Sequence, residues 1–198
     1  MESYRLEGQT FVIDDYDRKP AFSSFLPGLA GVKGIPLWTF YTNRGQGMNS
    51  FGIDNKGNAI MEFNSANTAF ENTQVKGFRT FLKIDGEYYE PFFTYEKEAK
   101  RQMRMNKNSF KIIETNEKYG IEVTVNYYVL PNESIGALVR QVSIKNISGQ
   151  KKNIEIIDGL PKIITYGISN GEFKEMSNLF KSWAYIKNID NKVPYYTL

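Results

Sequence analysis

The sequence predicts an all-β protein, mainly antiparallel, built as a two-sheet β-sandwich with one short helix near its carboxyl end. About ten short segments rich in β-branched and aromatic residues are separated by turn residues. Apolar residues at helical spacing occur only after residue 169. Strands joined by short turns, with no helices between them, bury their apolar faces best as two packed sheets.

The first half of the chain holds the less regular strands. An apolar run at residues 35–41, flanked by glycine-rich segments, indicates a buried strand. Asp85-Gly86 is a strong signal for a tight hairpin turn after the strand expected at 78–84. The other strands that we expect in this half are residues 10–13, 50–53 and 58–63.

The second half shows clearer strand patterns. In residues 121–130, Ile121, Val123 and Val125 alternate with Glu122 and Thr124, which is typical of a strand with one buried face. We expect further antiparallel strands at residues 102–105, 110–115, 135–147 and 153–157.

The pattern changes to a helical one near the carboxyl end. Residues 170–187 carry apolar side chains near helical spacing, with Ser169 or Asn170 as the N-cap, which predicts one amphipathic helix. We therefore expect a sandwich over residues 1–168, then this helix over 169–198 with the start of a further strand of the same domain. The sequence stops near the start of that strand, so we expect this chain to be a fragment of a longer protein.

Composition excludes several classes of function. The chain has no cysteine and no histidine, which rules out thiolate and imidazole chemistry within it. A net charge of +3 is too small to indicate a nucleic-acid partner. No signal peptide and no apolar run of about 20 residues are present, so we expect a cytoplasmic protein with no membrane partner.

Two motifs remain as candidates for binding. The segment Asn43-Arg44-Gly45-Gln46-Gly47 is either a tight turn or a ligand loop, because an arginine and two amides can hydrogen-bond hydroxyl or phosphate groups. Aromatic side chains can stack on sugar rings or fill the core. The residues singled out are the loop members Asn43, Arg44, Gln46 and Asn49 and the aromatic residues Tyr41, Phe51 and Tyr88.

Neither a metal site nor a catalytic residue is expected. Asp14, Asp15 and Asp17 crowd one turn but lack the spacing of a calcium loop. The remaining carboxylates fall mostly on the polar side of alternating strands, where solvated charges are usual. The spacing of Gly28, Gly31 and Gly34 matches no phosphate-binding motif, so we expect a plain loop that enters the strand at residues 35–41.

One longer stretch is more specific. Residues 38–53, Trp-Thr-Phe-Tyr-Thr-Asn-Arg-Gly-Gln-Gly-Met-Asn-Ser-Phe-Gly-Ile, together with 58–63, Ala66-Asn67 and 77–81, resemble the amino-terminal domain of glycoside hydrolase family 94. These enzymes are inverting β-glucoside phosphorylases. The resemblance runs over residues 10–198 and is nearest to the 1,2-β-oligoglucan phosphorylase branch, formerly often labelled cellobiose phosphorylase.

The resemblance implies a super-sandwich of the galactose-mutarotase type, followed in such enzymes by a helical linker, an (α/α)6 barrel and a small β domain. The barrel would carry the general acid and the site for inorganic phosphate, the co-substrate of the full-length enzyme, so this chain is expected to be inactive alone and to need no cofactor. The expected partners are a β-glucan oligosaccharide, the rest of the phosphorylase chain and a second copy in a homodimer. The loop of Asn43, Arg44, Gln46 and Asn49 would border the active site. The alternatives are a free-standing carbohydrate-binding module and a dimerisation module.

Overall fold

The structure, a computed structural model, describes residues 3–51, 65–93, 98–161 and 169–197. It confirms the predicted class, because the described strands form antiparallel sheets and the helices are few and short. The strand expected at residues 58–63 lies outside the described residues, and so does the end of the strand expected at 50–53.

The largest sheet has six strands, and their order brings the amino terminus beside the middle of the chain. The order is β1 (Tyr4–Glu7), β2 (Thr10–Asp14), β8 (Lys100–Met105), β9 (Ser109–Asn116), β10 (Ile121–Val129) and β11 (Leu138–Asn146). In β10 every second side chain from Ile121 to Tyr127 is buried, as the alternation predicted.

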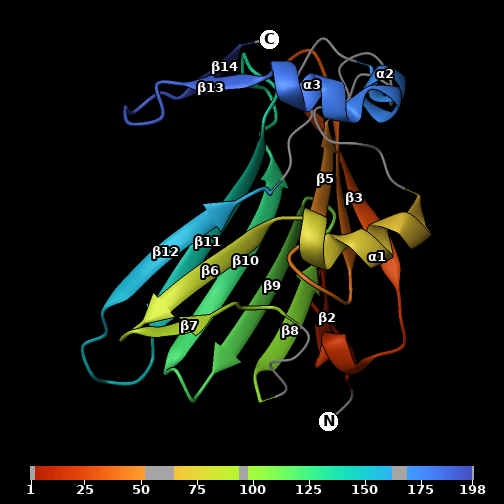
Figure 1. Cartoon of the computed structure of the whole chain (residues 1–198). Helices are drawn as coiled ribbons and strands as arrows, with labels where there is room; N and C mark the ends of the chain where they lie inside the picture. Colours follow the sequence, from red (N-terminus) through yellow and green to blue (C-terminus); the bar gives the residue numbers. More distant parts are fainter. Residues whose placement is uncertain (1–2, 52–64, 94–97, 162–168, 198) are drawn as a thin grey trace.

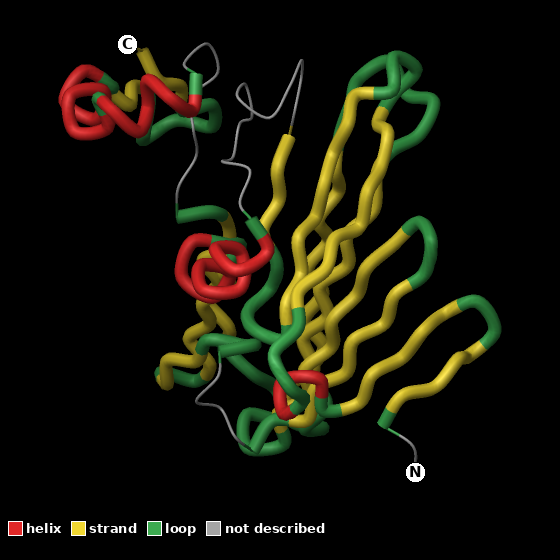
Figure 2. Tube along the Cα trace, turned by 90° about the vertical axis from the view of Figure 1, so that its right-hand side faces the viewer, coloured by secondary structure: helices red, strands yellow, loops and turns green. Residues whose placement is uncertain are grey.

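Two three-stranded sheets face this sheet. One has the order β12 (Ile154–Gly159), β6 (Arg79–Ile84) and β7 (Glu87–Tyr89), and the other has β3 (Ser23–Ala30), β4 (Ile35–Thr42) and β5 (Met48–Phe51). Figure 1 shows the first of them in front of the long strands and the second to one side. Figure 2, from the side, shows the long strands of the six-stranded sheet as a separate layer.

The core lies between these layers. The inner face of the six-stranded sheet contributes Ile112, Val125 and Tyr127, and β6 contributes Leu82 and Ile84. All five are at most 2% exposed, so one continuous core joins the layers. The turn from β6 to β7 is the predicted hairpin, with positive φ at both Asp85 and Gly86.

The glycine-rich segment around Gly28 differs from the expectation of a loop. Residues 23–30 form β3, and Gly28 pairs with Leu37 of β4. A Cβ at Gly28 would lie 2.4 Å from Cγ2 of Val129, so only glycine allows β3 to cross the end of β10 this closely. The strand is therefore imposed by packing, although its own sequence contains Pro27 and Gly28.

The helices also differ from the expectation. A helix that the sequence did not predict, α1 (Ala66–Lys76), packs on the β3-β4-β5 sheet (Figure 1). The single helix expected over residues 170–187 is wrong in its extent. The structure has α2 (Asn170–Glu175) and α3 (Ser177–Trp183), separated at Met176, and then β13 (Tyr185–Lys187), which pairs with β14 (Tyr195–Thr197).

The predicted N-cap of this region is confirmed. The Ser169 side chain accepts a hydrogen bond from the Glu172 backbone N–H, and the Glu172 carboxylate accepts one from the Ser169 backbone N–H. This reciprocal capping box explains why α2 begins where it does. None of the helices in the described ranges is both long and apolar enough to cross a membrane.

Candidate functional site

The loop between β4 and β5 is the centre of the candidate site, and hydrogen bonds hold its first half. The hydroxyl of Thr42 accepts from the Arg44 backbone N–H at 3.0 Å and donates to the Arg44 carbonyl at 2.9 Å. The Asn43 side chain donates to the carbonyl of Lys19 at 2.9 Å. Asn43 is thus buried and fixes the loop to the turn before β3.

The second half of the loop lies against α1 and β6. Gly45 and Gly47 both have positive φ, and a Cβ at Gly45 would approach the Gln74 backbone to 3.0 Å. The Gly47 carbonyl accepts a hydrogen bond from the Phe78 backbone N–H at 3.1 Å. The two glycines allow a reversal that brings the residue between them, Gln46, into the interior.

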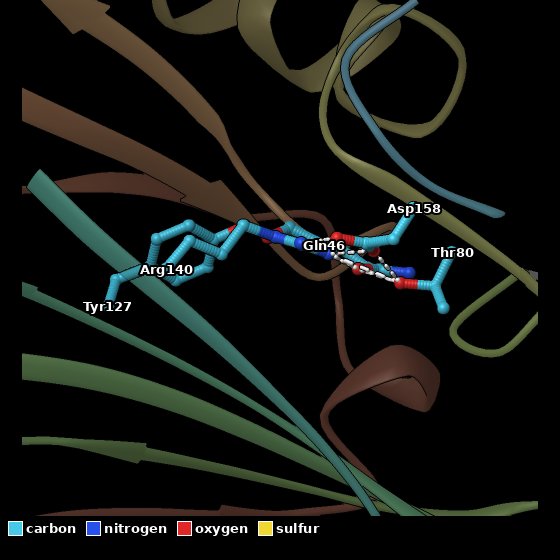
Figure 3. Close-up of polar contacts among 5 residues, drawn as sticks. All are labelled: Gln46, Thr80, Tyr127, Arg140 and Asp158. Atoms are coloured by element: carbon cyan, nitrogen blue, oxygen red, sulfur yellow. Dashed lines mark hydrogen bonds and ion pairs between the residues drawn. The ribbon is translucent and has the colours of Figure 1, made fainter. Parts of the chain in front are cut away.

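Gln46 is 2% exposed and lies in a buried polar cluster with Thr80, Tyr127, Arg140 and Asp158. Figure 3 shows Arg140 and Tyr127 extending from the six-stranded sheet toward side chains of the opposite layer. The Tyr127 hydroxyl donates to the Gln46 carbonyl at 2.6 Å, and Arg140 Nη2 donates to Gln46 Oε1 at 2.5 Å. These contacts connect the two layers through polar groups.

Arg140 holds the cluster together. Its Nε donates to the Tyr127 hydroxyl at 3.1 Å, and its two Nη groups form a forked pair with the carboxylate of Asp158. Its guanidinium also lies 4.7 Å from the ring centroid of Phe78. The side chain of Arg140 is only 8% exposed, whereas the side chain of Asp158 is 31% exposed. The ion pair therefore extends from the interior to solvent.

The protonation states of the cluster follow from burial and charge. Burial lowers the pKa of Arg140, but the neighbouring Tyr127 and Asp158 outweigh it and leave the pKa above its ordinary value. Burial raises the pKa of Tyr127, with Arg140 partly opposing the shift. Arg140 is therefore a cation and Tyr127 a neutral donor.

One donor of the cluster is unused. Gln46 Nε2 is buried and has no hydrogen-bond partner in the part of the chain that the structure describes. A buried donor without a partner costs about 1–3 kcal/mol. The cluster thus stabilises the loop but leaves one buried donor unsatisfied. Local strain of this kind is common where a loop has a functional role.

Arg44, unlike Gln46, points away from the interior. It is exposed, and its guanidinium lies 4.3 Å from the ring centroid of Phe70 in α1. Of the predicted loop residues, Arg44 is placed where a ligand can reach it, whereas Asn43 and Gln46 are inside. Asn49 is in β5 opposite Thr39, and its side chain is not among the described groups.

The three aromatic candidates have separate positions. The ring of Tyr41 stacks on the core residue Phe110 at 4.5 Å between centroids. Tyr88 is 81% exposed on β7. Phe51 pairs with Leu37 through the backbone, and its side chain is not among the described groups. Tyr41 and Tyr88, whose side chains are described, therefore do not form one stacking surface.

A second buried network was not predicted. Arg101 Nε donates to Glu114 at 2.5 Å, and Arg101 Nη1 donates to Asp17 at 2.8 Å. Glu114 also accepts from the Tyr89 hydroxyl and from the backbone N–H of Phe92, which has a positive φ. Burial raises the pKa of Glu114, and Arg101 opposes the shift. This network fixes the turn after β2 and the segment after β7.

Inward-facing charges were the signal for both networks. Arg140 lies on the same face of β11 as the apolar residues Leu138, Val142 and Ile144, and Glu114 lies on the same face of β9 as Phe110 and Ile112. Within the described ranges, no group of three or more acidic side chains is placed to bind a metal ion.

Comparisons with known proteins gave no match to a family model and no significant match to a curated protein.

Proposed function

We propose that this chain is the amino-terminal, non-catalytic sandwich of an inverting β-glucan phosphorylase. The full-length enzyme would work in the cytoplasm as a homodimer and would convert β-1,2-gluco-oligosaccharides and inorganic phosphate to glucose 1-phosphate. The sandwich would contribute to assembly and to the border of the active site. The motif in residues 38–53 supports this proposal.

The structural observation that supports the proposal best is the construction of the loop between β4 and β5. Gln46 holds the loop from inside, while Arg44 lies outside on Phe70. A guanidinium on a loop fixed in this way offers several donors to a sugar hydroxyl or a phosphate in a defined position. Glu114 and Asp158 are each paired with an arginine, which is the usual state of structural carboxylates.

A chimera tests the proposal. This chain would replace the sandwich of a known β-1,2-oligoglucan phosphorylase, and phosphorolysis of sophorose would be measured as release of glucose 1-phosphate. We expect activity in the chimera and a fall in kcat/KM of about tenfold or more for Arg44→Ala, since a charge-assisted hydrogen bond contributes about 1.5–3 kcal/mol. Lys33→Ala, on the exposed turn between β3 and β4, serves as the control.

Two results would contradict the proposal. One is a chimera that is folded and dimeric but inactive. The other is release of glucose 1-phosphate from sophorose by this chain alone, because the proposal assigns the chemistry to a separate barrel.

A second candidate function, a carbohydrate-binding module, is favoured by the outer face of the β12-β6-β7 sheet. Tyr88, Phe81 and Ile157 are exposed there, and the register places Tyr88 opposite Lys83 and Phe81 opposite Ile157. Lys83 Nζ donates to Glu155 at 3.0 Å on the same face. Rings beside paired charges suit both the C–H faces and the hydroxyls of a sugar.

Calorimetry with β-1,2- and β-1,4-linked gluco-oligosaccharides would test this second function. We expect Tyr88→Ala to abolish measurable binding, and Tyr195→Ala, an exposed tyrosine of β14, to leave it unchanged. No heat at millimolar sugar with the unmodified chain would argue strongly against a binding module.

A further inference from the structure

A groove at one end of the outer face of the six-stranded sheet has the chemistry of a site for a neutral sugar. It has a volume of about 460 Å³, within the range of small-ligand sites. The antiparallel order brings the β1–β2 turn, the β8–β9 turn and the end of β10 to the same end of the sheet. The uncharged polar residues that line the groove are Gln9, Thr10, Asn106, Asn108, Ser109, Asn126 and Tyr128.

Seven of the ten residues that line the groove carry a side-chain amide or hydroxyl, and Lys107 is its charged member. Each side-chain amide supplies two N–H donors and an acceptor oxygen, and each hydroxyl supplies one donor and an acceptor oxygen. A sugar presents hydroxyl groups that also donate and accept, so the two surfaces match without a net charge. A phosphate or carboxylate would find a single cation here, which is a weak basis for binding an anion.

Asn126 provides the second observation. Its Oδ1 is buried and has no hydrogen-bond partner in the described ranges, and the residue lines the groove. An acceptor in this state costs about 1–3 kcal/mol unless something donates to it. The amide plane of asparagine turns readily about χ2. Such a rotation would bring the amide oxygen of Asn126 to the groove, where a ligand hydroxyl would donate to it.

The walls of the groove have groups that suit contact with a sugar ring. Tyr128 lies two residues after Asn126 on the same face of β10 and offers an apolar ring and a hydroxyl. On the opposite side, Oδ1 of Asn106 accepts from the backbone N–H groups of Asn108 and Ser109, both at 2.8 Å, and fixes the β8–β9 turn. The lining therefore includes a turn held by hydrogen bonds.

The hollow at the other end of the same face is different. It is larger, about 640 Å³, but its lining is charged. Three of its charged residues already have partners, because Arg101 pairs with Glu114, Asp14 with Arg5 and Lys100 with Glu117. The amide-lined groove retains an unsatisfied acceptor, whereas these charges are paired.

We propose that this groove binds one or two residues of a neutral oligosaccharide, with Asn126 and Tyr128 as the principal contacts. The site is separate from the loop of Arg44 and from the face of Tyr88, and it does not depend on phosphorylase activity elsewhere.

Nuclear magnetic resonance with the ¹⁵N-labelled chain tests the proposal. The probes are a β-1,2-linked glucotriose, maltotriose and inorganic phosphate, each raised to about 10 mM, a range that detects weak sites. We expect either sugar to shift the side-chain amide signals of Gln9, Asn106, Asn108 and Asn126, and phosphate to leave them in place.

Variants then assign the contacts. Asn126→Ala and Tyr128→Ala should each weaken binding about tenfold, as loss of one good contact does. Asn108→Ala, in the exposed turn, gives a third variant that is less able to disturb the sheet. Thr124→Ala, on the same face of β10 but outside the groove, is the matched control.

The proposal is overturned if neither sugar shifts these signals, if phosphate shifts them and the sugars do not, or if the sugars shift only signals near Tyr88 or Arg44. It is also overturned if folded Asn126→Ala and Tyr128→Ala chains bind as well as the Thr124→Ala control. A phosphorylase chimera that fails would leave these sugar shifts unaffected, so the two proposals fail separately.

Discussion

Arg140 and Gln46, 94 residues apart in the sequence, are joined by a hydrogen bond of 2.5 Å in the interior of the protein. The contact fixes the loop between β4 and β5 to the six-stranded sheet. Because Arg140 also binds Thr80, Tyr127 and Asp158, its removal affects four partners together.

Arg140→Ala should lower the free energy of unfolding by about 2–4 kcal/mol, because it leaves Asp158 and Gln46 without their charged donor. Arg140→Lys should recover only part of this loss, since an ammonium cannot reproduce the forked geometry. Urea denaturation at neutral pH measures both. Lys145→Ala, at an exposed position of the same strand, should change the free energy of unfolding by no more than about 0.5 kcal/mol. An Arg140→Ala chain as stable as the control would show that the cluster contributes little.

Arg101→Met should be more costly, about 3–5 kcal/mol, because it leaves the carboxylate of Glu114 buried without its cation. Adding Glu114→Leu to the same chain should restore part of that stability, since the fully buried carboxylate is then removed and only Asp17, whose side chain is 14% exposed, has lost its cation. The comparison of single and double variants by urea denaturation isolates the coupling between the two residues. A double variant less stable than Arg101→Met would argue that Glu114 is held mainly by Tyr89 and Phe92.

The attachment of β1 should depend on pH. The hydrogen bond from Gln102, followed by Arg5, holds the pKa of Asp14 below its ordinary value, and hydrogen bonds from Arg5 and Arg104 lower the pKa of Glu7. A lowered pKa in the folded state adds stability above the unfolded pKa, near 4, and this stability is lost as the pH falls through the folded pKa.

We therefore expect hydrogen-exchange protection of residues 4–7, corrected for intrinsic rates, to fall between about pH 6 and about pH 3. Protection in β10 should change less over the same range. Arg104→Gln should reduce the pH dependence at β1, because it removes one of the two cations bound to Glu7. Equal protection of β1 at both pH values would rule out this account.

Ser169→Ala should destabilise α2 by about 1 kcal/mol, since it removes half of the capping box. Local hydrogen exchange in residues 170–175 is the appropriate measurement, because the capping box holds the first turn of α2. Ser182→Ala, in α3, is the control, and the core strands should be unaffected. If exchange in α2 did not change, the first turn would have to be held by something other than its cap.

The regular strands were predictable because their sequences carry the pattern that their burial requires. In β10, alternating apolar residues meet the core, and the structure follows that alternation from Ile121 to Tyr127. β3 was not predictable in this way. In the sequence, Pro27 and Gly28 favour a loop. The segment becomes a strand because it pairs with β4 and packs closely against Val129.

The missed helix α1 has a related cause. Its buried residues, Ala69 and Thr73, lie four positions apart, but neither is a large apolar side chain. Its apolar stripe is therefore weak, and the packing against β3 and β4 is visible only in three dimensions.

The candidate site was predictable only in part. The glycines around Gln46 marked an unusual loop, but a turn and a ligand loop have the same sequence signature. The direction of Gln46 depends on Thr80 and Arg140, which are distant in sequence. Arg140 at an inward position of β11 was the available clue.

The order of synthesis gives the buried cluster a further consequence. Gln46 leaves the ribosome long before Tyr127, Arg140 and Asp158, so the loop cannot reach its final contacts while most of the chain is still being made. The second network also depends on a residue that is made later, because Asp17 can pair with Arg101 only after 84 more residues have been synthesised. Pairings of such large sequence separation fold slowly and only once the distant partner is present. We therefore expect nascent chains that end before residue 140 to remain sensitive to proteases around the β4–β5 loop, and chains extended past Asp158 to become resistant there.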